Sequence, residues 1–410
     1  MNTPHHVVIA GGGLAGAKTA EALRAQGFAG NVTLLAAEPH LPYERPPLSK
    51  GYLAGESSFD DAVVHPESWY RDNAIDLRRG TRATAIDAGG HRLRVADGTE
   101  AGYDKLVLAT GALPRRLPLP GGDSQGVYYL RTREDSDAIR SCFGEGKRLV
   151  IIGGGWIGLE VAAAARGAGT HVTLLEAAEL PLLGVLGPEL AQVFADLHQA
   201  NGVDLRLGVR IDAIATSDGR AAGARLADGT TIEADGIVVG VGVAPDLTLA
   251  ESAGLDTGNG VLVDASLRSS DPDIYAVGDI ANHDHPVLGQ RVRVEHWATA
   301  LKQPAAAAAA LLGEDTAYAE LPYFFSDQYD LGLEYIGHAP PGSYDQVVVR
   351  GDRAKRQFVA FWLAGGRLKA AMNVNVWDVI DQIKPLITSG TQIDPAQLAS
   401  PDVPYPSLGS

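Results

Sequence analysis

The fold of this chain is decided by the stretch Val7-Val-Ile-Ala-Gly11-Gly-Gly13-Leu-Ala-Gly16. Alanine-rich sequence and a second apolar run, Val32-Thr-Leu-Leu35, follow it. This order predicts a buried strand, a glycine turn, a helix and a second strand. In the pattern G-x-G-x-x-G, Gly11 allows a sharp turn, Gly13 lets the backbone approach a pyrophosphate, and Gly16 lets the helix pack closely on the strand. Because the helix N-terminus offers free N–H groups to phosphates, the stretch predicts a dinucleotide site.

The same pattern returns 142 residues later as Leu149-Val-Ile-Ile-Gly153-Gly-Gly155-Trp-Ile-Gly158. Alanines and the apolar run Val172-Thr-Leu-Leu175 follow it again. A lone match of this kind is weak evidence, but here each match follows a predicted strand and opens a predicted helix. The sequence therefore predicts two dinucleotides, held face to face.

An acidic residue about 20 residues beyond the last glycine binds the adenosine ribose in such folds. Glu176 holds that position in the second unit, and it would repel a 2′-phosphate. No arginine or lysine lies between Glu176 and Gly187 to receive such a phosphate, so NADH is expected to be preferred over NADPH. In the first unit the position is Ala36, and Glu38 follows two residues later. For Glu38, ribose contact and a solvated loop charge both remain open.

Composition limits the remaining possibilities. The chain has 410 residues, which favours two to four domains, and a formal charge of −16, which disfavours nucleic acid and anionic membranes as partners. Its single cysteine, Cys142, excludes an internal disulfide, a CxxC redox pair and a cysteine-based metal cluster. We expect no metal, no secretory signal and no spanning segment, and we expect a cytoplasmic protein.

Two further motifs follow predicted strands. Leu106-Val-Leu-Ala-Thr110-Gly111 is a strand that ends in Thr-Gly, and Ile274-Tyr-Ala-Val-Gly278-Asp279 ends in a glycine turn with an aspartate at a helix start. Asp279 could accept hydrogen bonds from ribityl hydroxyls or could be a plain N-cap, and both interpretations remain open.

Together these motifs resemble those of flavoproteins with two dinucleotide-binding domains. Five narrower motifs are similar to those of the NADH-dependent ferredoxin reductases that serve bacterial cytochromes P450 and ring-hydroxylating dioxygenases. These are Pro42-Tyr-Glu-Arg45-Pro-Pro-Leu-Ser-Lys50, Leu130-Arg131-Thr132, Gly158-Leu-Glu160, Glu295-His-Trp297 and Phe325-Ser-Asp-Gln-Tyr-Asp330. The resemblance runs from about residue 7 to about residue 330 and continues more weakly beyond.

The resemblance implies an α/β fold with two Rossmann-like domains, for FAD and NAD, and a C-terminal α+β domain. FAD would be bound non-covalently by the first unit and NADH by the second. Lys50 would pair with Glu160 near flavin N5, where the hydride arrives, and would orient the nicotinamide; a structural ion pair is the alternative. The resemblance implies cofactor contacts at Gly11, Gly13, Ala15, Gly16, Ala37, Glu38, Arg45, Lys50, Ala83, Thr110, Gly111, Arg131, Gly153, Gly155, Ile157, Gly158, Glu160, Glu176, Gly242, Gly278, Asp279, Glu295, His296, Trp297 and Phe325.

One departure and one absence bear on mechanism. Relatives often have tryptophan where this chain has Phe325, so any role of an indole N–H is lost. No cysteine lies in the region from Glu38 to Lys50, where related disulfide and peroxide reductases carry theirs. Electrons are therefore expected to leave from the flavin itself, one at a time, to a small [2Fe–2S] ferredoxin that supplies a cytochrome P450 or a Rieske-type oxygenase. An NADH oxidase or quinone reductase of the same fold, and a redox sensor resembling apoptosis-inducing factor, remain alternatives.

An acidic ferredoxin would need a local basic patch on this acidic chain. Candidates are Arg350–Arg356, which could instead be a solvated hairpin turn, and the group Arg291, Arg293 and Lys302. We expect a monomer or weak homodimer.

The predicted domains are a discontinuous FAD domain (1–115 and 245–321), an inserted NADH domain (116–244) and a C-terminal domain (322–410). A helix is expected over 296–312. The C-terminal domain is predicted to hold strands at Asp345–Val349, Gln357–Leu363 and Leu368–Met372, a helix at Trp377–Ile387 and, from Asp394, an extended proline-rich tail.

Overall fold

The computed structural model describes residues 4–408 and divides into two compact units. Unit 1 comprises the chain up to Arg45, Phe59–Leu113 and Val243–Pro322. Unit 2 comprises Pro46–Ser58, Pro114–Gly242 and the chain from Tyr323 onward. The predicted division into FAD, NADH and C-terminal domains stays a prediction.

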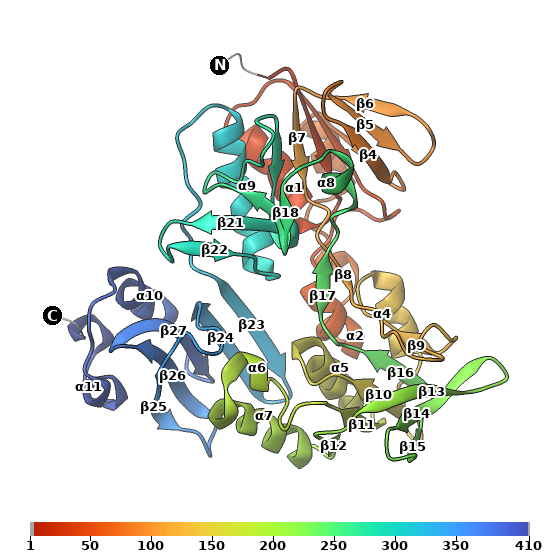
Figure 1. Ribbon diagram of the computed structural model, residues 1–410, viewed down its shortest axis with the longest axis vertical. Helices are drawn as coiled ribbons and strands as arrows, with labels where there is room; N and C mark the ends of the chain where they lie inside the picture. Colours follow the sequence, from red (N-terminus) through yellow and green to blue (C-terminus); the bar gives the residue numbers. More distant parts are fainter. Residues whose placement is uncertain (1–3, 409–410) are drawn as a thin grey trace. The chain divides into compact units, whose positions relative to one another are not determined.

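A five-stranded parallel sheet forms the centre of unit 1 (Figure 1). Its strands in spatial order are β20 (Ile274–Ala276), β7 (Lys105–Leu108), β1 (His6–Ala10), β2 (Asn31–Leu35) and β3 (Ile75–Arg78). Val7, Val8 and Ile9 are fully buried, as expected for a central strand covered on both faces. Helix α1 (Leu14–Ala25) packs against α9 (Trp297–Leu311), which confirms the helix predicted over 296–312.

Smaller elements surround this sheet. Unit 1 contains antiparallel β4 (Ala83–Asp87), β5 (Arg92–Val95) and β6 (Glu100–Gly102), the sheet of β18 (Thr257–Gly258), β19 (Gly260–Val263), β21 (Ala281–His285) and β22 (Gln290–Val292), helices α3 (Glu67–Asp72) and α8 (Thr248–Ser252), and 3-10 turns η2 (Asp60–Ala62) and η3 (Gly278–Ile280). The pair β8 (Ala112–Pro114) and β17 (Val243–Pro245) lies where the chain passes from one unit to the other.

Unit 2 contains a second five-stranded parallel sheet. Its strands in spatial order are β12 (Asp204–Arg206), β11 (His171–Leu175), β10 (Arg148–Ile152), β16 (Gly236–Val239) and β9 (Val127–Tyr128). Around it lie 3-10 turn η1 (Pro46–Ser49), helices α2 (Gly51–Ala54), α4 (Arg133–Arg140), α5 (Trp156–Gly167), α6 (Leu183–Leu186) and α7 (Pro188–Ala200), and the antiparallel strands β13 (Ile211–Ser217), β14 (Arg220–Leu226) and β15 (Thr231–Glu233). The two parallel sheets confirm the predicted pair of Rossmann-like folds.

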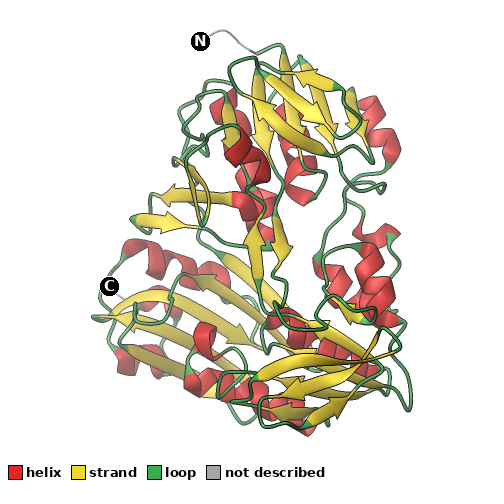
Figure 2. Cartoon of the chain, turned by 45° about the vertical axis from the view of Figure 1, so that its right-hand side comes forward, coloured by secondary structure: helices red, strands yellow, loops and turns green. Residues whose placement is uncertain are grey.

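The end of the chain adds an antiparallel sheet to unit 2, with α10 (Ile380–Ser389) beside it (Figure 1 and Figure 2). Its strands in spatial order are β23 (Tyr323–Gln328), β24 (Leu331–Gly337), β27 (Arg367–Val374), β26 (Gln357–Ala364) and β25 (Gln346–Asp352). The three predicted strands are confirmed. The predicted helix starts three residues later than Trp377, because Asp378 has a left-handed φ of 63° that no helix interior accepts.

The prediction of an extended tail from Asp394 is wrong. Helix α11 (Pro395–Ala399) starts there, because the Asp394 carboxylate accepts from the N–H of Ala396 at 2.9 Å and proline suits the first helical position. The guanidinium of Arg350 donates to the carbonyls of Leu398 at 2.7 Å and Val403 at 3.0 Å. Arg350 is therefore buried beneath this segment and is not part of a surface patch.

The stretch Arg350–Arg356 takes the hairpin form that the sequence left open. Strand β25 pairs with β26 from Gln346 to Asp352, and the remaining residues of the stretch make the turn. None of the helices within residues 4–408 has the length and apolar content needed to cross a membrane.

Candidate active site

The first glycine turn joins β1 to α1 and has no room for a side chain at Gly11 or Gly16. Gly11 has a φ of +128°, and a Cβ there would lie 2.1 Å from the carbonyl oxygen of Ala109, just beyond β7. A Cβ on Gly16 would lie 1.9 Å from the carbonyl oxygen of Gly11. These contacts account for the predicted sharp turn and close helix–strand packing.

The second turn, between β10 and α5, is built in the same way. Gly153 has a φ of +105°, and a Cβ there would lie 2.4 Å from the carbonyl oxygen of Gly240, just beyond β16. A Cβ on Gly158 would lie 2.1 Å from the carbonyl oxygen of Gly153. Both turns thus lie at the carboxyl ends of parallel strands, where such sheets bind ligands.

Both turns fit a pyrophosphate. Helices α1 and α5 have 12 residues each, and each begins after a glycine N-cap, Gly13 or Gly155, that forms no side-chain cap. Neither helix has an acidic residue in its first turn. A Cβ on Gly13 would meet nothing within 4 Å, and one on Gly155 would meet only the carbonyl oxygen of Gly240 at 3.9 Å, so there is open space beside each N-cap. Uncapped N–H groups beside open space suit the phosphates of FAD or NAD.

The two predicted ribose acids have different surroundings. Glu176 lies directly after β11, and its carboxylate accepts from the N–H groups of Gly154 at 2.5 Å and Ala178 at 2.8 Å. It therefore stands against the glycine turn, at the predicted place. Glu38 accepts from the hydroxyl of Tyr43 at 2.5 Å and from Arg45 Nη2 at 2.9 Å. Glu38 is thus a paired charge whose side chain is 29% exposed.

Several predicted residues of unit 1 lie together near α1. Gly278 has a φ of +78°, and a Cβ there would come within 3.0 Å of the Ala15 Cβ. Asp279 follows in η3, whose N-cap is Val277, so Asp279 is not the N-cap. Burial lowers the pKa of Arg45, but Tyr43, Glu38 and Asp279 raise it further, so the guanidinium stays charged.

The remaining predicted residues of unit 1 have clear places. Trp297, the first residue of α9, donates from Nε1 to Glu44 Oε2 at 2.9 Å. Thr110 Oγ1 donates to the carbonyl oxygen of Asp246 at 3.2 Å. The others lie after β2, at the start of β4, after β7 and before α9: Ala37, Ala83, Gly111, Glu295 and His296.

In unit 2 the predicted Lys50–Glu160 pair is formed. Lys50 Nζ lies 2.7 Å from Glu160 Oε1, and the Glu160 side chain is 3% exposed against 17% for Lys50. Two hydroxyls also donate to this carboxylate, from Ser49 at 2.5 Å and from Ser326 at 2.6 Å. The Phe325 ring centroid lies 5.3 Å from Lys50 Nζ, so the phenylalanine contacts the cation through its face.

This cluster gathers three hydrogen-bond donors around one buried carboxylate. The more exposed ammonium can turn to a carbonyl such as that of a nicotinamide amide. Sequence reasoning missed Ser49 and assigned no role to Ser326, although both lie in motifs that carried the resemblance. A serine does not by itself indicate a functional site, because most serines are ordinary surface or helix-capping residues.

The other predicted residues of unit 2 lie on three separate segments. Arg131 precedes α4, and its N–H donates to Asp135 Oδ2 at 3.0 Å. Ile157 is 42% exposed in the first turn of α5. Gly242 follows β16 with a φ of +96°.

The second candidate basic patch is largely neutralised. Arg291 pairs with Asp284 at 2.8 Å, and Lys302 lies 3.6 Å from Glu320. Arg293 pairs with Glu295 at 2.6 Å and has a side chain only 5% exposed. These pairs leave little net positive charge for an acidic partner. Among residues 4–408 no group of three or more His, Cys, Asp and Glu side chains could hold a metal ion.

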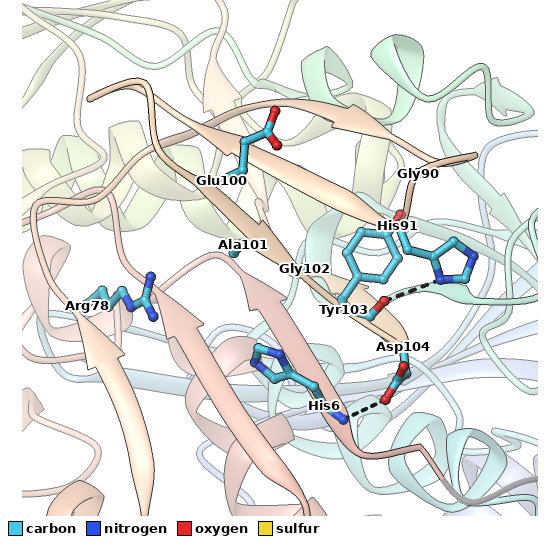
Figure 3. Close-up of a pocket in the computed structure, with 9 residues that line it drawn as sticks. All are labelled: His6, Arg78, Gly90, His91, Glu100, Ala101, Gly102, Tyr103 and Asp104. Atoms are coloured by element: carbon cyan, nitrogen blue, oxygen red, sulfur yellow. Dashed lines mark hydrogen bonds between the residues drawn. The ribbon is translucent and has the colours of Figure 1, made fainter.

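A separate cavity of about 530 Å³ lies on unit 1 (Figure 3). His6 begins β1, and its N–H donates to the carboxylate of Asp104, which precedes β7, at 2.9 Å. The cavity therefore lies beside the amino ends of these strands, whereas the glycine turns lie at the carboxyl ends. It contains none of the predicted site residues.

Comparison with known proteins agrees with this geometry. Residues 5–304 match the family described as pyridine nucleotide-disulphide oxidoreductase, and residues 323–408 match the family described as reductase C-terminal. The ferredoxin reductase subunit of 5,5'-dehydrodivanillate O-demethylase from Sphingobium is 43% identical over 408 residues, which cover 99% of this chain and 98% of that one.

Two more relatives are equally similar in extent. The ferredoxin–NAD(+) reductase component of the anthranilate 1,2-dioxygenase system from Burkholderia cepacia is 44% identical and covers 97% of each chain. The structure of the covalent putidaredoxin reductase–putidaredoxin complex matches with a TM-score of 0.94 at 38% identity, covering 99% of this chain and 98% of that one. The resemblance stated from the sequence is confirmed: this chain belongs to the pyridine nucleotide-disulphide oxidoreductase family, and within it to the ferredoxin reductases.

Proposed function

We propose that this chain is an NADH-dependent ferredoxin reductase with one FAD. It takes a hydride from NADH and passes electrons singly to a [2Fe–2S] ferredoxin that supplies a cytochrome P450 or Rieske-type oxygenase in the cytoplasm. The observation that carries the proposal is the pair of glycine turns, each opening an uncapped 12-residue helix at the carboxyl end of a parallel sheet. Relatives named as ferredoxin reductases over nearly the whole chain support it.

We assign FAD to the turn of Gly11 and NADH to the turn of Gly153. The division that goes with this assignment is an FAD domain of 1–115 and 245–321, an NADH domain of 116–244 and a C-terminal domain of 322–410. In the second turn the Glu176 carboxylate lies against Gly154, where it can accept from ribose hydroxyls and repel a 2′-phosphate. NADH is therefore preferred over NADPH.

The bound flavin supplies the redox chemistry, because it accepts a hydride and releases electrons one at a time. The residues of the chain bind and orient. The two glycine turns fix the pyrophosphates, and the Lys50 ammonium holds the nicotinamide amide while Glu160 orients the ammonium. Cys142 is buried at the end of α4 and has no second cysteine, so no thiol relay follows the flavin.

The test is turnover with and without the partner. Purified protein loaded with FAD should reduce cytochrome c with NADH rapidly only when a [2Fe–2S] ferredoxin is added. Equal rates without ferredoxin would favour an NADH oxidase or quinone reductase. Very slow reduction with a persistent NADH adduct would favour a redox sensor.

A further inference from the structure

A chain of polar side chains runs from Glu160 to helix α7 within unit 2; Figure 1 labels α5, β23 and α7, the elements on which it is built. Ser326 and Gln328 lie on β23, and Gln328 Nε2 lies 3.2 Å from Ser326 Oγ. His198 lies on α7, with Nε2 2.9 Å from Gln328 Oε1. The hydroxyl of Tyr329 lies 3.3 Å from His198 Nδ1 and closes the series.

Three of these side chains are removed from solvent. Ser326 and Gln328 are each 1% exposed and His198 is fully buried, whereas Tyr329 is partly exposed. Leaving a polar atom of the three buried groups unpaired is unfavourable, because burial removes its hydrogen bonds to water. The series is therefore costly unless every buried member is satisfied, which here requires one consistent direction of donation.

The carboxylate sets that direction. Because Glu160 can only accept, Ser326 must donate its hydroxyl hydrogen to Oε1. Ser326 Oγ is then free to accept from the Gln328 amide N–H, and the Gln328 carbonyl oxygen accepts from His198 Nε2–H. His198 Nδ1 is left as an acceptor for the Tyr329 hydroxyl.

The titration behaviour of the far end agrees with this direction. Burial lowers the pKa of His198 to about 4, so the ring is neutral and can accept at Nδ1. Burial also raises the pKa of Tyr329, so its hydroxyl keeps the hydrogen that it donates.

We propose that Ser326, Gln328, His198 and Tyr329 form a one-way hydrogen-bond relay, and that its members are positioning residues for the Lys50–Glu160 pair. The relay fixes the Glu160 carboxylate by a donor that remains when the ammonium turns away. Without it, a carboxylate only 3% exposed would lose much of its compensation each time Lys50 released it for a nicotinamide. This role rests on the proposed function of the pair, whereas the direction of the relay does not.

The direction can be measured directly by histidine NMR. In FAD-bound, 15N-histidine-labelled protein, His198 should show a single Nε2–H tautomer; its signals are assigned by their loss in His198→Gln. Glu160→Gln replaces the acceptor-only group by an amide that can also donate, so His198 should change to a mixture of tautomers. Ser326→Ala should have the same effect, and Ser326→Thr, which restores a hydroxyl, should reverse it.

Ser49→Ala is the matched control. It also removes a serine hydroxyl from Glu160, but from Oε2 and outside the relay, so the His198 tautomer should stay as it is. The relay is overturned if His198 is an Nδ1–H tautomer in the unmodified protein. It is also overturned if the His198 tautomer is unchanged in both Glu160→Gln and Ser326→Ala.

The positioning role is tested separately by anaerobic stopped-flow reduction of the bound flavin. Ser326→Ala and the milder Tyr329→Phe should lower the limiting rate, Ser326→Ala by about tenfold, while the FAD content stays unchanged and Ser326→Thr recovers the rate. If Lys50→Ala slows reduction but the relay variants do not, the positioning role is overturned. If neither Lys50→Ala nor the relay variants slow reduction while the tautomer responds, the proposed function of the pair fails and the relay stands.

Discussion

The two glycine turns are nearly the same in backbone and differ in what stands over them. In both, the first strand pairs in parallel with the next over five residues, from His6 to Ala10 and from Arg148 to Ile152. In the first turn a Cβ on Gly12 would lie 2.2 Å from the Ala36 Cβ, whereas in the second the N–H of Gly154 donates to Glu176. A single residue after the second strand thus decides whether the turn is lined by a methyl group or by a carboxylate.

In the proposed function this difference separates two roles within one fold. The glycines shared by both turns would make room for a pyrophosphate, and the residue after the second strand would contact the rest of the dinucleotide. The surroundings differ as well, since α1 is covered by α9 and α5 by β23. Each region can therefore be disturbed without the other.

The largest effect is expected from the helix glycines. Gly158→Ala places a Cβ 2.1 Å from a backbone oxygen and should weaken NADH binding or the fold by about 3 kcal/mol or more, with FAD retained. Gly16→Ala should instead release FAD. Isothermal titration and flavin absorbance distinguish the two.

Gly167→Ala serves as the control, because a Cβ at this helical position meets nothing within 4 Å. Loss of FAD from Gly158→Ala with a native fold would show that the two turns do not act separately.

The second effect concerns stability in acid, since both units bury histidines whose pKa is lowered by burial. Burial lowers the pKa of His198 in unit 2 and of His283 in unit 1 to about 4. The unfolded chain binds protons at these groups below about pH 6.5, so stability should fall from there to about pH 4, by about 3 kcal/mol for each histidine. The midpoints of denaturant unfolding, recorded across this pH range, measure the loss of stability.

His198→Gln and His283→Gln should each reduce the dependence of the unfolding free energy on pH. Replacing the exposed His171 in the same way should leave this dependence unchanged. An unaltered slope in both variants would mean that other groups govern acid sensitivity.

Removing the Lys50 ammonium should slow hydride transfer without releasing FAD from the first glycine turn. Lys50→Ala leaves a carboxylate 3% exposed without its cation and should slow anaerobic flavin reduction by NADH about 30-fold, about 2 kcal/mol, with FAD still bound. Lys18→Ala, which removes a partly exposed helical ion pair in unit 1, is the control. Unchanged hydride transfer would make the Lys50 pair purely structural.

The smallest effect is expected at the residue that follows the second strand, which is Ala36 in the first unit and Glu176 in the second. Glu176→Ala makes the second turn resemble the first and should narrow the preference for NADH over NADPH about tenfold, because the charge that repels a 2′-phosphate is gone. The ratio of kcat/KM values for the two nucleotides measures this effect. Glu179→Ala, in the same loop, should not change this ratio. An equal change in both variants would mean that Glu176 does not contact the ribose.

Sequence was informative where one local rule dominates. Apolar runs that end in glycines predicted both parallel sheets, because burial on both faces and positive φ leave few alternatives at positions such as Gly11 and Gly153. The tail was mispredicted because its proline content was given more weight than the sequence Asp394-Pro395. In that sequence the aspartate caps a helix that begins at the proline. The relay could not be predicted, since His198 and Gln328 are 130 residues apart and nothing in either residue type names its partner.

The burial of Arg350 also makes the end of the chain part of the folding unit. Its guanidinium is held by main-chain carbonyls of residues 397–403, and its face stacks 4.3 Å from the ring centroid of Tyr405. Trimming the protein before residue 397 would therefore remove the carbonyl partners of Arg350 and uncover the face of β25 that this segment packs against. Shortened versions made for crystallisation or fusion should keep the polypeptide through Tyr405.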